Sequence, residues 1–380
     1  MKVIAFPCEL DSQEARCALL PNNIKSYTLM GYSVLIESGL GFQLNIEDSD
    51  YKDAGAVVAD SREDLFKRAD LILSVRKIPQ SELSQVQGKI LISFLDAFNE
   101  DAYLDALTTY RITSFSMEMI PRSTRCQKMD ALSSQASLAG YAMVIQALNN
   151  YSSIMPMMMT AAGTIKPAKV FVIGAGVAGL QAIATAKRLG ATVTAFDTRT
   201  VVADQVRSLG AKFLEIDLGE TKQTEQGYAQ ALSTEQLAIQ QAEQAKCICD
   251  SDIVITTAQL FGRKPPVLIK DETIAQMKPG AVIVDMAALD GGNVEGTVAG
   301  EISVKHKVTI VGTGNWPNMV AYNASQMYAN NLQNLVSEFT DSDEQTFSID
   351  LEDEIQTLAV ITHNGSVTNQ MVQNALKEAS

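Results

Sequence analysis

Histidine is nearly absent from this sequence of 380 residues, in which only His306 and His363 occur. Neither lies in a recognisable motif. Catalysis by a Ser–His or Cys–His pair needs a histidine beside the nucleophile, and catalytic zinc is held mainly by histidines. The scarcity of histidine therefore argues against both kinds of chemistry.

The five cysteines are too few and too scattered to organise the fold. Their number is odd, no Cys-x-x-Cys occurs, and only Cys247 and Cys249 lie close together. We expect reduced thiols in a cytosolic chain, most of them buried as small hydrophobic residues.

Long apolar runs and an excess of basic residues are also missing. No window of about 18 apolar residues occurs that could cross a bilayer, and the apolar run at the N-terminus is too short for a signal peptide. The 44 acidic residues outnumber the 30 basic ones, which gives a formal charge of −14. Such a chain has no strong attraction for nucleic acid or for an anionic membrane surface. We therefore expect a soluble protein with no direct membrane span, which does not bind nucleic acid.

What the sequence does contain is a regular alternation of short apolar runs with amphipathic stretches. The length favours two domains. In the N-terminal third we expect strands at Val3–Phe6, Ser33–Ile36, Leu71–Val75, Ile90–Phe94 and Ile112–Phe115. Farther along the chain we expect them at Lys169–Ile173, Thr192–Ala195, Lys212–Glu215, Asp252–Thr256, Ala281–Val284 and Lys307–Val311. This pattern predicts an α/β protein with two doubly wound, Rossmann-like domains on parallel sheets.

Two long helical stretches, roughly Asp130–Tyr151 and Val320–Phe339, contain no strand signal and are expected to join the domains. Residues 1–130 and 320–380 would then form an N-terminal α/β domain, and residues 131–319 a Rossmann domain that binds a nucleotide. The C-terminal segment would pack back on the first domain.

The segment Val172–Leu180 carries the strongest motif, a Gly-x-Gly-x-x-Gly pattern formed by Gly174, Gly176 and Gly179. An apolar strand pattern precedes it and an alanine-rich helical pattern follows. Gly174 would permit the tight turn, and Gly176 would let the backbone approach a pyrophosphate. Gly179 would let helix and strand pack closely. The alternative is a close-packed strand–helix turn without a ligand.

Asp197 follows the next strand and indicates which dinucleotide would bind. A carboxylate there accepts hydrogen bonds from both hydroxyls of the adenosine ribose and repels a 2′-phosphate, which favours NAD(H) over NADP(H). Arg199 leaves the second option open, because an arginine just past this strand can hold a 2′-phosphate. Further residues expected at the cofactor are Val177, Ala178 and Thr198.

The chain resembles the NAD(H)-binding component (alpha subunit, domain I) of proton-translocating NAD(P) transhydrogenase. It resembles more distantly the alanine dehydrogenases that share its fold. The similarity runs from the segment Glu14–Pro21 to about Phe339.

The stretch Pro121–Gln135 resembles the loop that defines the transhydrogenase component. The resemblance implies that the nicotinamide and its ribose are surrounded by Arg122, Gln127, Asp130 and Ser133. Gln127 would also reach toward the second nucleotide, on a partner. These side chains offer the donors and acceptors that orient a carboxamide. The alternative is a capped helix start, in which Asp130 and Ser133 share one face.

Other segments agree with the resemblance. Tyr228 falls where the family has a mobile loop that closes over the nucleotide, although a solvated helix face is the ordinary alternative. The segments 285–287 and 291–293 resemble the strand end beside the nicotinamide, and we also expect Ala258 at the cofactor. The segment Pro156–Thr164 resembles the link into the nucleotide domain; taken alone, its methionines indicate buried core. Cys126 departs from the family, which usually has a small residue there.

An alanine dehydrogenase-like amino-acid oxidoreductase is the alternative function. The substrate arginine of those enzymes corresponds to Arg16, and their substrate lysine to Arg76. Their catalytic histidine position holds Asp96 here, and their catalytic aspartate position holds Leu289. Oxidative deamination must move protons, for which a group that titrates near neutrality is the usual agent. Hydride transfer between two nicotinamides needs only close, well-oriented and dry rings.

We therefore expect an NAD(H)-binding subunit of a Re/Si-specific, proton-translocating transhydrogenase. It would exchange a hydride with NADP(H) on a partner and be active only with its NADP(H)-binding and membrane proton-channel partners. The resemblance implies a homodimer, cytoplasmic and attached peripherally to the inner membrane through these partners. A nucleotide-binding regulatory protein without turnover is a third hypothesis.

Overall fold

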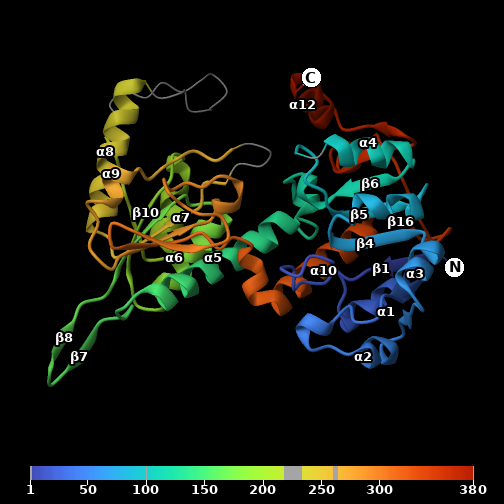
Figure 1. Ribbon diagram of the computed structural model, residues 1–380, viewed down its shortest axis with the longest axis horizontal. Coiled ribbons are helices and arrows are strands. Elements are labelled where there is room, and N and C mark those ends of the chain that lie inside the picture. Colours follow the sequence, from blue (N-terminus) through green and yellow to red (C-terminus); the bar gives the residue numbers. More distant parts are fainter. Residues whose placement is uncertain (1, 100, 218–232, 260–263, 380) are drawn as a thin grey trace. The chain divides into compact units, whose positions relative to one another are not determined.

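The computed structural model describes residues 2–99, 101–217, 233–259 and 264–379. Contacts between residues divide the chain into two compact units. Unit 1 comprises Met1–Gln135 and Val320–Ser380, and unit 2 comprises Ala136–Met319. Helix α5 (Ala131–Asn150) begins in unit 1 and continues into unit 2 (Figure 1).

Unit 1 is built on an eight-stranded sheet with the order β19-β18-β6-β5-β4-β1-β2-β3. Its parallel strands are β1 (Lys2–Phe6), β2 (Tyr32–Ile36), β3 (Val57–Val58), β4 (Leu71–Arg76), β5 (Ile90–Phe94) and β6 (Thr113–Ser116). Two C-terminal strands, β18 (Val360–His363) and β19 (Ser366–Val367), extend it by antiparallel pairing, with β18 beside β6. Strand order reverses between β1 and β4, the point at which α/β sheets open a crevice at their carboxyl edge.

Side chains from both faces of this sheet are buried, which explains why its central strands are apolar throughout. Ile4 and Phe6 belong to one hydrophobic cluster, whereas Ala5 between them belongs to another. The long helix α10 (Ala321–Phe339) packs on the first cluster through Tyr328 and Leu332. The other helices of unit 1 are α1 (Pro21–Leu29), α2 (Asp48–Asp53), α3 (Arg62–Arg68), α4 (Asp101–Thr109), α11 (Gln356–Ala359) and α12 (Gln370–Ala379). A small hairpin is formed by β16 (Thr340–Asp341) and β17 (Thr346–Phe347).

Unit 2 is built on a seven-stranded sheet with the order β11-β10-β9-β12-β13-β15-β14. Its parallel strands are β9 (Lys169–Ile173), β10 (Thr192–Phe196), β11 (Lys212–Phe213), β12 (Ile253–Thr256), β13 (Val282–Asp285) and β15 (Val308–Val311). The edge strand β14 (Ile302–Lys305) is antiparallel. The helices are α6 (Val177–Arg188), α7 (Ala203–Ser208), α8 (Thr234–Asp250) and α9 (Asp271–Ile274). Here the order reverses between β9 and β12, so the glycine motif at the end of β9 lies at the switch point.

The fold class predicted from the sequence is confirmed: both units are doubly wound α/β structures. Strands β5 and β9 have the predicted bounds, whereas β11 ends at Phe213 rather than Glu215. Among the described residues, no helix combines the length and hydropathy needed to cross a bilayer.

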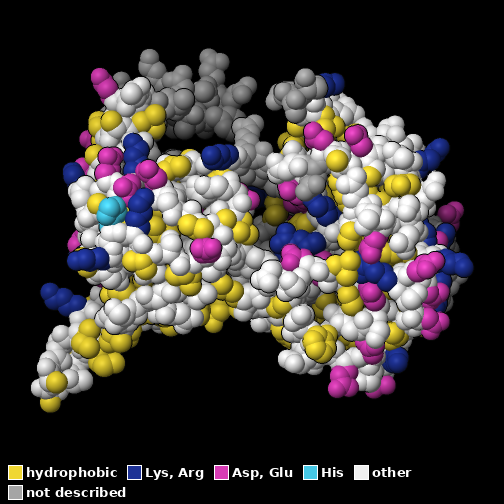
Figure 2. Space-filling model, viewed as in Figure 1, with side chains coloured by type: hydrophobic (Ala, Val, Ile, Leu, Met, Phe, Trp, Pro, Cys, Tyr) yellow, Lys and Arg dark blue, Asp and Glu magenta, His cyan; other side chains and the backbone are white. Residues whose placement is uncertain are grey.

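The interpretation of Pro156–Thr164 as buried core is wrong. This segment leads into a two-stranded hairpin, β7 (Met158–Thr160) and β8 (Gly163–Ile165), whose residues are all exposed. The hairpin projects from unit 2 (Figure 1), and Figure 2 shows hydrophobic side chains along it at the lower left. Met157 is 62% and Met159 72% exposed, so these methionines fill no gap in the core.

Candidate functional site

The first glycine of the motif makes a sharp turn at the end of β9. Gly174 has a φ of 101°, in the left-handed region where a side chain would be strained. Its backbone N–H donates to Phe196 O at 2.8 Å. Thr257 Oγ1, after β12, donates to Ile173 O at 3.2 Å or to Gly174 O at 3.1 Å. The chain therefore reverses at the switch point with its backbone polar groups satisfied.

The second and third glycines differ in what surrounds them. A Cβ atom on Gly179 would overlap the carbonyl of Gly174, so this glycine allows α6 to pack directly against the turn. A Cβ atom on Gly176 would meet nothing within 4 Å. Gly176 is the N-cap of α6, and no side chain caps the helix there. The first N–H groups of α6, which begins at Val177 and Ala178, can therefore bind an anion that approaches over Gly176.

Asp197 lies just after β10, beside the glycine turn. Its carboxylate accepts hydrogen bonds from Ala175 N at 2.7 Å and from Arg199 N at 2.8 Å. Arg199 Nε also forms an ion pair with it at 3.0 Å. Burial opposes ionisation of Asp197, but the hydrogen bonds from the Arg199 side chain and from the two backbone N–H groups outweigh it and hold the pKa below the ordinary value. The site thus presents an ionised carboxylate and a partly neutralised arginine.

The other cofactor residues predicted in unit 2 lie at the same sheet edge. Thr198 is exposed next to Asp197, and Ala258 is half-buried after β12. Tyr228 lies outside the described residues. The structure therefore brings together, at the carboxyl ends of β9, β10 and β12, the predicted residues Gly174, Gly176, Val177, Ala178, Gly179, Asp197, Thr198, Arg199 and Ala258.

In unit 1, Asp130 caps the start of α5. Its carboxylate accepts hydrogen bonds from Ser133 N at 2.8 Å and from Ser133 Oγ at 2.5 Å. The capped helix start, the alternative raised from the sequence, is thus present, and it leaves open whether the pair also meets a ligand. Arg122 and Gln127 are exposed on the preceding loop.

This loop is fastened to α10. Lys128 O accepts a hydrogen bond from Asn331 Nδ2 at 2.9 Å, and the side chain of Arg125 pairs with Glu338 at 2.9 Å. Cys126, the departure from the family pattern, is fully buried in the core of unit 1, where its Sγ lies 3.2 Å from Ser123 Oγ.

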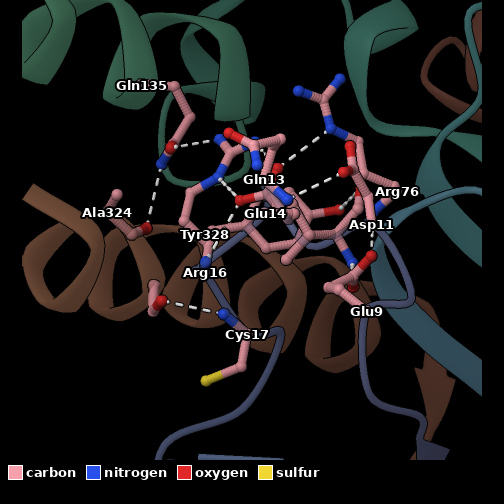
Figure 3. Close-up of polar contacts among 12 residues, drawn as sticks. Glu9, Asp11, Gln13, Glu14, Arg16, Cys17, Arg76, Gln135, Ala324 and Tyr328 are labelled. Carbon is pink, nitrogen blue, oxygen red and sulfur yellow. Dashed lines mark hydrogen bonds and ion pairs between the residues drawn. The ribbon is translucent and has the colours of Figure 1, made fainter. Parts of the chain in front are cut away.

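A buried charge cluster lies near the switch point of unit 1 (Figure 3). Arg16 Nε donates to Glu14 Oε1 at 2.7 Å, and Nη2 to Glu14 Oε2 at 2.6 Å. Its remaining terminal nitrogen donates to Gln135 Oε1 at 2.9 Å, and Arg76 Nε donates to Glu14 at 3.0 Å. Burial opposes ionisation of Glu14, but the hydrogen bond and charge of Arg16 prevail and lower its pKa. The arginine that matches the substrate arginine of alanine dehydrogenases is therefore already bound to a carboxylate of its own chain.

Glu9 belongs to the same cluster and was not singled out from the sequence. Its carboxylate accepts Val75 N at 2.6 Å and Arg76 N at 3.1 Å, at the end of β4. Burial raises its pKa to about 7 despite these bonds. No local motif marks Glu9, because its environment is created by the return of β4 beside β1.

Both histidines lie at the opposite edges of their sheets. His306 is in the turn before β15, at the amino edge of the unit 2 sheet, and its Nε2 lies 2.8 Å from Asp271 Oδ1. His363 ends β18, which runs antiparallel to β6, and its Nδ1 lies 3.0 Å from Thr113 Oγ1 at the start of β6. Neither imidazole is at a carboxyl edge, where ligands of α/β sheets bind. Asp96, at the histidine position of alanine dehydrogenases, is exposed and accepts a hydrogen bond from Asn99 at 2.8 Å.

Comparison with known proteins gives consistent relationships across the chain. Residues 5–139 match the family described as Alanine dehydrogenase/PNT, N-terminal domain, and residues 143–370 match Alanine dehydrogenase/PNT, C-terminal domain. The chain is similar to a Rhodospirillum rubrum protein named as the first of the polypeptides of NAD(P) transhydrogenase subunit alpha, at 41% identity over 96% of this chain and 97% of that protein. It is also similar to alanine dehydrogenase of Mycobacterium tuberculosis, at 32% identity over 77% of this chain and 74% of that protein.

Among solved structures, a transhydrogenase from Sinorhizobium meliloti superimposes with a TM-score of 0.85 at 39% identity, covering 97% of this chain and 100% of that one. The alanine dehydrogenase relationship is the more distant of the two by identity and by coverage. The match of both domains and the identity to full-length relatives show that this chain belongs to the alanine dehydrogenase/PNT family.

Proposed function

We propose that this chain binds NAD(H) in unit 2 and exchanges a hydride with NADP(H) held by a partner subunit, as part of a proton-translocating NAD(P) transhydrogenase. One observation carries the proposal: a dinucleotide-type glycine turn with an ionised Asp197 occupies the carboxyl edge of unit 2, while both histidines lie at amino edges. Relatives named transhydrogenase, at 41% and 39% identity, support it.

The residues of unit 2 fit NAD(H) in shape and charge. The open space over Gly176 and the uncapped N-terminus of α6 suit a pyrophosphate. The carboxylate of Asp197 suits the ribose hydroxyls and repels a 2′-phosphate, and the charge of Arg199 is offset by its ion pair with Asp197. These features favour NAD(H) over NADP(H).

The nicotinamide supplies the hydride, and the chain has to bind, orient and shield the ring. We assign the orienting role to the exposed Arg122 and Gln127 together with Asp130 and Ser133. Paired donors and acceptors fix a carboxamide in one orientation, which is the geometric requirement of hydride transfer. None of these four groups has to give or take a proton in that step.

An amino-acid dehydrogenase is less well supported. Its substrate carboxylate would have to displace Glu14 from the 5% exposed Arg16, at the loss of buried charge-assisted hydrogen bonds. Leu289, at the position of the catalytic aspartate, is 53% exposed and cannot transfer a proton.

The hairpin β7–β8 supports a homodimer. A two-stranded hairpin is marginally stable alone in water, and this one exposes Met157, Met158, Met159 and Ile165. We propose that a second copy of the chain covers it. The membrane proton channel and the NADP(H) site would belong to partner subunits, through which the chain would be held at the cytoplasmic face of the inner membrane.

Titration calorimetry with NADH and NADPH, followed by a reconstituted assay, tests this function. We expect the chain to bind NADH in preference to NADPH. We also expect it to transfer hydride to NADP⁺ only after the NADP(H)-binding partner is added. Reduction of NAD⁺ with alanine by the chain alone would instead support the dehydrogenase, and NADH binding without either reaction would support a regulatory protein.

A further inference from the structure

Asp285 closes the loop that follows β13. It is fully buried, at 0% exposure, and lies at the last position of the strand. Its carboxylate accepts hydrogen bonds from the backbone N–H groups of Ala287 at 3.1 Å, Asn293 at 2.9 Å and Val294 at 3.1 Å. Thr297 Oγ1 donates to it as well, at 2.8 Å. One carboxylate therefore holds both ends of the loop 286–297.

Asn293 connects this loop to the segment after β12. The side chain is also 0% exposed, and its Nδ2 donates to Ala258 O at 3.0 Å and to Pro266 O at 2.9 Å. On the surface, Gln259 Nε2 donates to Asp290 Oδ2 at 2.6 Å. The loops at the carboxyl ends of β12 and β13 are thus joined by one buried and one exposed link.

Close packing leaves these loops little room to rearrange. Gly292 has a φ of 80°, and a Cβ atom there would lie 2.9 Å from Asp285 Oδ2. A Cβ atom on Gly314 would overlap the side chain of Leu289. Trp316 Nε1 donates to Met286 O at 3.2 Å. Both faces of the loop are therefore fixed by the body of unit 2.

The position of the loops determines which part of a dinucleotide they can meet. The glycine turn and Asp197 occupy the β9–β10 side of the switch point, which in this fold takes the adenosine half. The loops after β12 and β13 lie on the other side, which takes the nicotinamide half. We propose that Asp285 and Asn293 are positioning residues that hold residues 257–259 and 286–293 as a preformed platform for the nicotinamide half. This inference rests on the NAD(H) function proposed above.

A preformed platform matters because hydride transfer depends on ring placement. A displacement of about 1 Å of a positioning group can slow a reaction by about a hundredfold. Asp285 does not touch the ring in this arrangement; it acts through the backbone of the loop. Its loss should therefore affect the nicotinamide end and spare the adenosine end.

Asp285→Asn tests the assignment, because the carboxamide keeps the size of the side chain but turns an N–H₂ group toward backbone N–H groups. We expect the affinity for ADP, which lacks the nicotinamide half, to stay within about twofold of the wild type. The affinity for NADH should fall about tenfold, which corresponds to the loss of one or two hydrogen bonds to a charged group. Single-turnover hydride transfer to NADP⁺ on the partner should slow by about a hundredfold.

Asp252→Asn is the matched control. Asp252 accepts the backbone N–H of Lys169 at 2.8 Å and an ion pair from Lys278 at 2.8 Å, but it lies at the amino end of β12. This variant should lose stability without changing the ratio of NADH to ADP affinity. Gln259→Ala removes the exposed link to Asp290 and carries the test if Asp285→Asn does not fold. It should lower NADH affinity about threefold and leave ADP binding unchanged.

The outcomes separate this inference from the proposed function. Equal losses of ADP and NADH affinity in Asp285→Asn and in Gln259→Ala, or no loss of either, would overturn the positioning role. A wild-type chain that binds neither nucleotide would overturn the proposed function, and this inference with it, before any variant is measured. A selective loss of NADH binding and transfer supports the platform.

Discussion

At the scale of single residues, Asp197 is the most informative side chain of the site. We predict that Asp197→Ala lowers NADH affinity by about tenfold to a hundredfold, because hydrogen bonds to a buried charge are lost. The preference for NADH over NADPH should shrink, since Arg199 is then free to meet a 2′-phosphate. Asp204→Ala, which removes an exposed ion pair with Arg207, is the control. Unchanged affinities for both nucleotides in Asp197→Ala would show that the ribose assignment is wrong. Titration calorimetry measures both.

Two glycines of the motif should respond differently to the same substitution. Gly176→Ala adds a methyl group in open space, so the free energy of unfolding should be unchanged while NADH affinity falls about tenfold or more. Gly179→Ala adds it against the carbonyl of Gly174, so unfolding should also cost about 1–3 kcal/mol less. Urea unfolding and NADH titration on both variants check this. Tight NADH binding by Gly176→Ala would mean that no pyrophosphate approaches there.

The raised pKa of Glu9 predicts a pH dependence of stability. Because burial raises this pKa to about 7, the folded protein holds the proton more tightly than the unfolded chain does. The stabilising contribution is therefore complete at low pH and is lost as the pH rises from the ordinary value near 4.5 to about 7. Across this window, wild type should lose about 3 kcal/mol of unfolding free energy relative to Glu9→Gln. The exposed Glu63→Gln should give a curve parallel to wild type, and a parallel curve for Glu9→Gln would refute the assignment.

The residues of the candidate site divide by how they could be found. Gly174 and Asp197 are predictable because each acts through its own place in a strand–turn–helix sequence. Glu9 and Asp285 were not assigned these roles from the sequence, since their surroundings come from strands distant in the chain. Arg16 was noted, but its pairing with Glu14 depends on side-chain geometry that spacing does not specify.

At the scale of elements, the central parallel strands are the predictable part of the fold. They are buried on both faces and read as continuous apolar runs, as in β9. The missed elements are short or antiparallel: β3, β14, β18 and the β7–β8 hairpin. Such strands lack the long apolar run and are held by pairing with neighbours, which a single segment does not reveal.

The hairpin supplies the prediction at this scale. If a second copy covers β7–β8, Met159→Lys places a charge in that interface and should raise the dimer dissociation constant by at least about tenfold. Leu29→Lys, at a site that is 76% exposed in unit 1, should leave the dimer intact. Sedimentation equilibrium on both variants measures the effect. An unchanged dimer in Met159→Lys would place the interface elsewhere.

At the scale of the whole molecule, the chain combines a nucleotide-binding edge in unit 2 with a self-neutralised charge cluster in unit 1. Both histidines lie at the edges away from ligand-binding positions. This distribution suits a protein that places one nicotinamide and leaves proton chemistry to other subunits.

Single-turnover hydride transfer from NADH on this chain to NADP⁺ on its partner, measured across neutral pH, tests that claim most directly. Without proton transfer by this chain, the rate constant should change by less than about twofold, and the double variant His306→Ala, His363→Ala should match wild type. A rate that follows a titration and is lost with either histidine, or the absence of any transfer, would contradict the account.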